Sequence, residues 1–204
     1  VGVFELALYC AYKTHNRHGE AVQAFARSHG WPFSRNDDQG LQAKIEALFL
    51  KEQYDPYFII NVETGQRGLI FFNCSYTNRE YRKSRPTGTG CLVSSPRFEA
   101  VKQNVEIFPY SKIDEKLGTG EIKLDNPEFN KKYLVYAKDV DAAKQIVNPA
   151  LQAVLIEHSM KPIYNPVRIG LGPTGAVLMT GENLETERWI DLIELSRKVE
   201  EAIR

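Results

Sequence analysis

The chain has 204 residues, of which 43% are hydrophobic and 25% are charged, proportions that are typical of globular proteins and exclude disorder throughout the chain. Lys+Arg and Asp+Glu each number 26, so the formal net charge is zero. This balance excludes a global electrostatic field favouring nucleic acid or an anionic membrane, and any such partner must be bound by a local patch.

The first expected element is an apolar run from Val1 to Tyr12 in which only Glu5 is charged. A run of about 12 residues is too short to cross the hydrocarbon core, which needs about 20. Because aromatic residues lie near its end and a basic segment follows it, we interpret the run as the last turns of a transmembrane helix with a cytoplasmic flank. The expected membrane-flank residues are Tyr9, Tyr12, Lys13 and Arg17.

The alternative for this segment is an amphipathic core helix. Val3, Phe4, Ala7, Leu8 and Ala11 have the spacing of one helical face and would then pack on the rest of the domain. We favour the membrane interpretation. It divides the chain into residues 1–18, the end of the membrane-anchor helix and its basic flank, and residues 19–204, a single soluble α+β domain.

Two short helices are expected next, at residues 20–29 and 41–49, where apolar side chains recur at helical spacing. β-branched and aromatic residues then predict an antiparallel meander of about four strands. These strands are expected at residues 57–63, 68–76, 91–95 and 104–110, with the hairpin turn TGQRG between the first two.

The second half of the chain alternates helices and strands. Residues 121–137 predict a strand, a helical turn capped by Asp125 or Asn126 with Pro127 in its first position, and a second strand. The following stretch predicts two helices separated at Asn148-Pro149. A hairpin across Pro173-Thr174 and a long amphipathic helix at 185–203 complete the chain.

Together these patterns predict an α+β fold. Its expected parts are N-terminal helices, the first of them interpreted as the end of a transmembrane helix, an antiparallel meander, a helix pair, a second hairpin and a long C-terminal helix.

The letters GLGPTG at Gly170, Gly172 and Gly175 match the pattern of a dinucleotide-binding loop. That loop requires a strand before it and a helix after it, because the helix N-terminus holds the pyrophosphate. Only a short apolar run ending at Gly181 follows here. The sequence therefore predicts a hairpin turn at this point and no cofactor.

Catalytic and metal-binding patterns are weak. Cys74 and Cys91 lie in apolar runs and are expected in the core, and the three cysteines lack metal-site or disulfide-framework spacing, which favours a reducing compartment. His158 is expected at an exposed or semi-exposed helix end. Glu185, Glu187, Asp191 and Glu194 are expected on the N-terminal half and solvated face of the last helix. We assign no catalytic, cofactor-binding or metal-binding residue, and enzymatic activity stays open but disfavoured.

One basic segment stands out against this background. Between residues 76 and 86, cations and aromatic rings alternate in a mixture that can contact phosphates and stack on bases. The candidate contact residues for an anionic surface or a partner are Arg79, Tyr81, Arg82, Lys83 and Arg85. The alternatives are a solvated hairpin loop, which is the commoner use of such segments, and nucleic-acid binding, which the sequence disfavours.

Residues 125–155 carry a family resemblance. An acidic-small-PEFN run and a later NP-L-L helix are formed by Asp125, Pro127, Glu128, Phe129, Asn130, Tyr133, Val135, Asn148, Pro149, Leu151 and Leu155. The stretch resembles a bacterial and archaeal family catalogued as a domain of unknown function, number three thousand one hundred and thirty-seven. SHGWPFSRNDDQGL and FFNCSY extend the similarity to roughly residues 20–160, although Asn73 and Cys74 depart from the family pattern.

The resemblance implies a soluble domain that follows one or more membrane spans, and it implies no activity or catalytic residue. We therefore expect a membrane-tethered, cytoplasm-facing accessory or assembly domain that acts by binding other membrane-protein subunits. The alternatives are a soluble enzyme or regulator binding a phosphorylated ligand near Arg79–Arg85 and Gly170–Gly175, and a nucleic-acid-binding protein that uses the Arg79–Arg85 loop.

Overall fold

The computed structural model of the chain describes residues 16–49, 52–78, 87–110, 121–161, 166–185 and 188–203. Its strands are β1 (Phe33–Asn36), β2 (Glu52–Glu63), β3 (Gly68–Asn78), β4 (Thr87–Ser94), β5 (Val105–Pro109), β6 (Tyr133–Ala137), β7 (Val167–Gly172) and β8 (Gly175–Thr180). A helix at residues 16–28 is followed by α2 (Leu41–Leu48), the 3-10 helix η1 (Pro96–Ala100), α4 (Pro127–Asn130), α5 (Val140–Ile146), α6 (Pro149–Ser159) and α7 (Trp189–Ala202).

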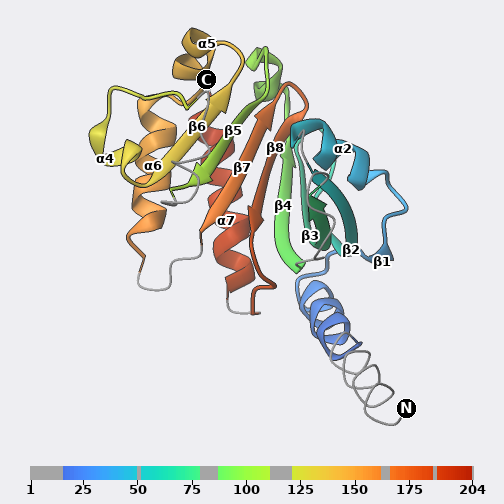
Figure 1. Ribbon diagram of the computed structural model, residues 1–204. Helices are drawn as coiled ribbons and strands as arrows, with labels where there is room; N and C mark the ends of the chain where they lie inside the picture. Colours follow the sequence, from blue (N-terminus) through green and yellow to red (C-terminus); the bar gives the residue numbers. More distant parts are fainter. Residues whose placement is uncertain are drawn as a thin grey trace.

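All the named strands form one antiparallel sheet in the order β1-β2-β3-β4-β8-β7-β5-β6 (Figure 1). This arrangement confirms the predicted α+β fold, the meander β2-β3-β4 and the hairpin β7-β8. The predicted fourth strand, β5, is present, but its predicted place next to β4 is wrong, because β5 pairs with β6 and β7. The later hairpin inserts between β4 and β5, and strand periodicity carries no information about such non-local pairing.

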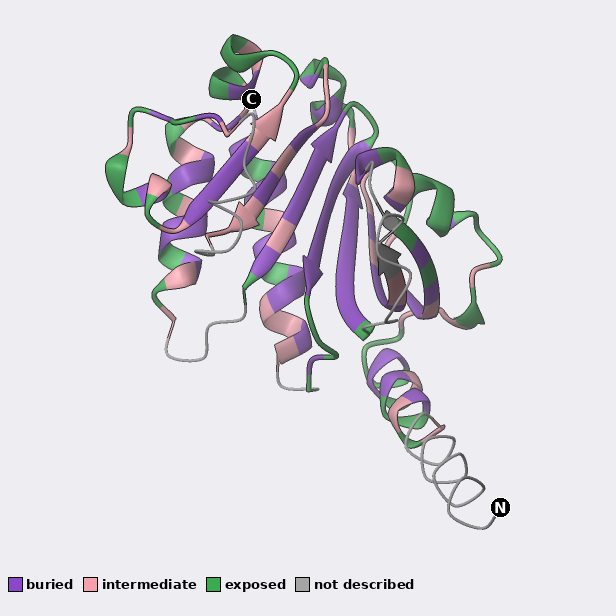
Figure 2. Cartoon of the chain, in the orientation of Figure 1, coloured by how far each residue is buried: buried purple, intermediate pink, exposed green. Residues whose placement is uncertain are grey.

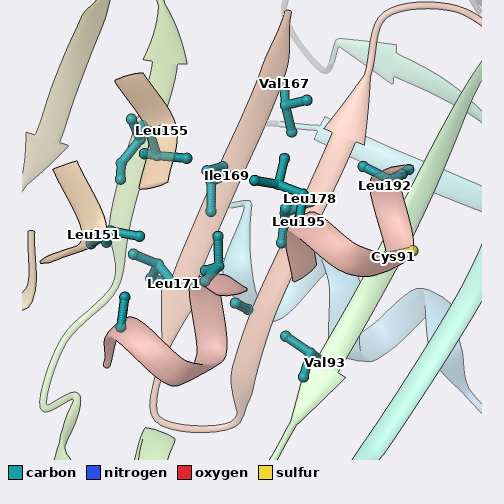
Figure 3. Packing of buried hydrophobic residues seen from close by; sticks show 14 of the residues in the cluster. Cys91, Val93, Leu151, Leu155, Val167, Ile169, Leu171, Leu178, Leu192 and Leu195 are labelled. Carbon is teal, nitrogen blue, oxygen red and sulfur yellow. The ribbon is translucent and has the colours of Figure 1, made fainter. Parts of the chain in front are cut away.

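One face of the sheet is covered by α6 and α7. Leucines on both helices meet the apolar side chains of β4, β7 and β8, as Figure 3 shows for Leu151, Leu155, Leu192, Leu195, Ile169 and Leu178. All six of these side chains are buried, and they form the centre of the main core. The period of the C-terminal helix was predicted correctly, but the helix begins at Trp189 and not at residue 185.

The opposite face carries α2, which covers only part of the sheet. Leu41, Ile45 and Leu48 pack against a second apolar cluster that includes Phe72 and Met179. Figure 2 shows the outer side of α2 exposed and the central strands β4, β7 and β8 almost wholly buried. The sheet is therefore fully sandwiched only near its centre.

Asparagine caps begin the PEFN turn, α4, and the second helix of the predicted pair, α6. Asn126 Oδ1 accepts the N–H groups of Glu128 at 3.1 Å and Phe129 at 3.2 Å. Asn148 Oδ1 does the same at the start of α6, and its Nδ2 donates to the carbonyl of Ala202 at 2.8 Å. The second cap thus satisfies the first turn of α6 and ties it to the end of α7.

The turn between β7 and β8 requires glycine. Gly175 has φ 149°, and a Cβ there would lie 2.3 Å from the carbonyl oxygen of Val93. The GLGPTG letters therefore form a buried hairpin, as predicted.

His158 is a correction to the sequence analysis. It was expected at an exposed or semi-exposed helix end, but the residue is only 7% exposed because α7 packs over the last turns of α6. Periodicity within one helix does not reveal which other helix will cover it.

Candidate functional site at one end of the sheet

The helix at residues 16–28 docks one of its sides on the domain. Gly19, Val22, Phe25 and Ala26 are buried, whereas Arg17 is exposed. In Figure 1 this helix lies at the lower end of the sheet, and its residue-16 end points away from the domain. No helix among the described residues is both long and apolar enough to span a bilayer.

An aromatic cluster holds this helix in place. The Phe25 ring lies 4.9 Å from the Trp189 ring at an interplanar angle of 76°, and His18 lies 6.0 Å from Trp189 and 6.1 Å from Phe58. Trp189 Nε1 donates to the carbonyl oxygen of Leu184 at 2.8 Å. Edge-to-face pairs of this kind stabilise beyond their buried area, so the direction of the helix is fixed relative to the sheet.

A β-bulge lies beside this docking point. The pairing of β2 with β3 shifts between Tyr57 and Ile60, and Phe58 within the bulge has φ 50°. The left-handed region is costly for a bulky side chain, by about 1–3 kcal/mol. The buried Phe58 ring packs against Gly19, so contacts from the N-terminal helix help to hold the strained conformation.

Next to the bulge, a row of polar side chains crosses four strands, where a core would ordinarily be apolar. Tyr57 pairs with Asn73 and Asn73 pairs with Thr89 in the strand register. The Thr180 hydroxyl in β8 accepts the Thr89 N–H at 3.2 Å and lies 2.7 Å from the carbonyl oxygen of Glu182. Asn73, Thr89 and Thr180 are at most 2% exposed.

Segment 181–185 closes this polar row. Asn73 Nδ2 donates to Thr89 Oγ1 at 3.0 Å and to Asn183 Oδ1 at 3.2 Å, and the N–H of Leu184 donates to Thr89 Oγ1 at 2.8 Å. Asn73 Oδ1 is buried and has no hydrogen-bond partner within the described ranges. Burial raises the pKa of Tyr57, and its hydrogen bond with Asn183 opposes that rise. The Tyr57 phenol is therefore a neutral group at physiological pH.

A polar groove of ≈ 580 Å³ opens beside the outer end of the row. Its described lining residues come from β1, β2, β3, β4, α2 and the segment between β1 and α2, namely Asn36, Asp37, Gln42, Asp55, Pro56, Tyr57, Ser75 and Thr87. Asp37 is already engaged, because its carboxylate accepts the N–H groups of Leu41 at 2.8 Å and Gln42 at 2.7 Å at the start of α2.

The β2 edge that borders the groove is closed to an added strand. β1 pairs with β2 only up to Asn36 opposite Tyr57, so no described strand pairs with the first part of β2 on that side. There the N–H of Tyr54 donates to Glu46 Oε1 at 3.3 Å, and Pro56 has no N–H. Few donors remain for an incoming peptide, a common protection of sheet edges.

Most of the predicted contact residues lie outside the described residues. These are the membrane-flank residues Tyr9, Tyr12 and Lys13, and the candidate contact residues of the basic segment, Arg79, Tyr81, Arg82, Lys83 and Arg85. β3 ends before the basic segment and β4 begins after it, both at the lower end of the sheet (Figure 1), and Thr87, the first residue of β4, lines the groove.

The predicted phosphate site combines the basic segment with the glycine-rich hairpin, and Arg79–Arg85 lie outside the described residues. Gly175 contacts Val93 and Ser94 at one end of β4, whereas Thr87, next to the basic segment, begins β4 at the other end. At about 3.3 Å per residue these ends are roughly 23 Å apart. The Gly175 turn and the strand residue that follows the basic segment, Thr87, therefore lie at opposite ends of β4.

Sequence patterns missed the polar row. Asn73 was noted only as a departure from a family pattern, and Thr89 and Thr180 were unremarkable among neighbouring strand residues. The signal that could have found them is an amide within the apolar run GLIFFNCSY, because a buried amide needs partners on adjacent strands. Across the described parts of the chain, no group of three or more His, Cys, Asp or Glu is placed to hold a metal ion.

Residues 90–169, which run from β4 into β7, match the family described as Protein of unknown function (DUF3137). The predicted family resemblance is confirmed over this segment. No curated protein gives a significant match. The chain is similar to the crystal structure of the mycobacterial trehalose monomycolate transport factor A, TtfA, with a TM-score of 0.58 and 12% sequence identity over 91% of this chain and 94% of that chain. At this identity, the likeness shows a shared fold.

Proposed function

We propose that this chain is a membrane-tethered, non-catalytic accessory domain of a membrane protein complex, placed on the cytoplasmic side and acting by protein binding. The observation that carries the proposal is the docked helix at residues 16–28. Its residue-16 end points away from the sheet, and the sequence before it holds the apolar run of residues 1–12 and the flank with Lys13 and Arg17.

The docking geometry supports a boundary near residue 18. Gly19 is the first buried residue of the described helix, and contacts with Phe58 and Trp189 begin at His18. A helix fixed in this way transmits its direction to the whole domain. A tether of residues 1–18 would therefore orient the soluble part of residues 19–204 relative to the bilayer.

The fold comparison supports an accessory role in transport. TtfA is described as a transport factor for trehalose monomycolate, and its chain shares this fold over almost its whole length. We propose that the present chain serves a membrane transport or assembly complex in a comparable way, with other membrane-protein subunits as its partners.

The basic segment supplies the proposed contact surface. Arg79, Tyr81, Arg82, Lys83 and Arg85 combine cations with an aromatic ring, the composition that suits an anionic surface or an acidic partner. β4, which follows this segment, begins at the same end of the sheet as the docked helix (Figure 1). A single membrane-facing end would thus carry both the tether and the contact.

The buried thiols support a binding role over nucleophilic chemistry. Burial raises the pKa of Cys91 to about 12, which keeps the sulfur protonated, and Cys74 is also fully buried. A nucleophilic cysteine needs a thiolate and access to substrate.

The test is membrane fractionation followed by affinity capture of the tagged full-length protein from its own host. We expect the protein to stay in the membrane pellet after alkaline carbonate extraction and to capture other membrane subunits in stoichiometric amounts. A Leu8→Arg variant places a charge in the apolar run and should shift the protein to the supernatant. Release of the unmodified protein by carbonate would contradict the tether, and a membrane-bound monomer without partners would contradict the accessory role.

A further inference from the structure

The polar groove contains several side chains with unused hydrogen-bonding capacity. Asn36, Asp55, Ser75 and Thr87 line it, and none of these side chains has a hydrogen-bond partner among the residues that the structure describes. Together they offer an amide, a carboxylate and two hydroxyls, so the groove presents both donors and acceptors. Its volume, ≈ 580 Å³, lies in the range of small-molecule sites.

Two departures from ordinary strand structure converge beside the groove. Phe58 has φ 50° in the bulge that follows Tyr57, and Asn73 buries an unpaired amide oxygen opposite Tyr57. Each costs stability, and local departures of this kind concentrate at functional sites. Because Tyr57 belongs to both the groove and the buried row, these departures point to the groove.

The lining selects among ligand classes. Asp37 uses its carboxylate to cap α2, so Asp55 is the one uncommitted charge among the described lining residues, and no group of three or more His, Cys, Asp or Glu in the described ranges could hold a cation. The lining residues within the described ranges include no Lys or Arg for an anion, and Pro56 is their sole purely aliphatic member. A ligand of many neutral hydroxyls can donate to Asp55 and accept from Asn36, Ser75 and Thr87 at once.

We infer that the groove lined by Asn36, Asp55, Tyr57, Ser75 and Thr87 binds a neutral polyhydroxylated group of the carbohydrate class. The Tyr57 ring offers an apolar surface for a sugar ring, and the surrounding polar groups orient its hydroxyls. The group could come from a free saccharide or from a glycolipid headgroup, two sources with the same recognition chemistry. The inference does not depend on the membrane tether.

The test is saturation-transfer NMR on the full chain in a polyoxyethylene detergent, since maltoside detergents carry sugar themselves. The probes are maltose, cellobiose and sucrose, each with inorganic phosphate as the anionic comparison. We expect saturation transfer to at least one disaccharide. We expect inorganic phosphate not to displace that disaccharide. Asp55→Ala should weaken binding about tenfold, as expected for a lost hydrogen bond to a charged group. Glu182→Ala, which removes an exposed carboxylate outside the groove, should leave binding unchanged.

A second arm distinguishes the sources. Vesicle-bound and free protein are compared using vesicles that contain glucosyl diacylglycerol and vesicles that contain phosphatidylglycerol. If the protein prefers the glycolipid vesicles, this preference depends on Asp55 and no disaccharide binds, the ligand is a glycolipid headgroup. If a disaccharide binds, the ligand is a free saccharide. No Asp55-dependent binding in either arm, or displacement of the sugar by phosphate, would overturn the inference. Membrane fractionation has no bearing on these outcomes, so failure of the tether is recognised separately.

Discussion

Gly19 and Phe58 are in contact so close that a Cβ atom on residue 19 would lie 2.5 Å from Cζ of the Phe58 ring. The contact joins the N-terminal helix to the bulge of β2, and Phe58 is only 2% exposed. The ring therefore has little room to withdraw.

Gly19→Ala should lower the thermal midpoint. Alanine favours the helix by about 1 kcal/mol, but crowding at a packed site costs about 1–3 kcal/mol, and we expect crowding to dominate. Gly181→Ala is the matched control, because nothing lies within 4 Å of a Cβ at that position. Thermal unfolding of both variants checks this, and a higher midpoint for Gly19→Ala would show that the Phe58 ring yields.

Thr89→Val should destabilise the polar row. The substitution keeps the side-chain shape but leaves the Leu184 N–H and one N–H of the Asn73 amide without an acceptor, at a cost of about 1–3 kcal/mol. Thr87→Val, in the same strand, replaces an exposed hydroxyl and should change stability by less than about 0.5 kcal/mol. Urea titrations measure both, and equal midpoints for the two variants would argue against a structural role for the Thr89 hydroxyl.

Local signals predicted the local structure well. The Asn126 and Asn148 caps, the GLGPTG hairpin and the period of the C-terminal helix all follow from residues close in sequence. The partners of β4 and β5 could not be predicted, because the hairpin that separates them comes more than 70 residues after β4.

The candidate site was harder to predict than the fold. Asn73, Thr89 and Thr180 come from three strands, and only their cross-strand register creates the polar row. The β2 bulge that displaces Tyr57 depends on packing by the helix at residues 16–28. Such a site has no sequence spacing of its own, whereas a motif within one loop does.

We expect the buried Cys91 thiol to make the folded state less stable at alkaline pH. Burial raises its thiol pKa from 9.0 to about 12, so the folded state keeps a proton that the unfolded state releases above about 9. The contribution of the Cys91 thiol to the free energy of unfolding is complete below pH 9 and is lost as the pH rises towards 12. Cys91→Ala should show a smaller difference in urea midpoint between about pH 8 and about pH 11 than the unmodified chain. Identical pH dependence in both would exclude this thiol as a contributor.

Arg67→Met should destabilise the contact between the β2-β3 hairpin and α7. Arg67 Nε lies 2.5 Å from Glu200 Oε2 and 3.3 Å from Glu63 Oε2, and the Glu200 side chain is only 5% exposed. Removing the cation leaves a buried carboxylate uncompensated. Because Arg67 is 37% exposed, solvent reduces the expected cost to about 1–3 kcal/mol.

The double variant Arg67→Met with Glu200→Met provides the decisive comparison. It replaces the ion pair by apolar groups, which is often close to neutral, so it should recover most of the stability that Arg67→Met loses. A double-mutant cycle by urea denaturation measures this coupling. Additive losses would mean that Arg67 acts through Glu63 alone, which also binds Arg197 Nε at 2.7 Å, and that Glu200 is stabilised by its burial environment.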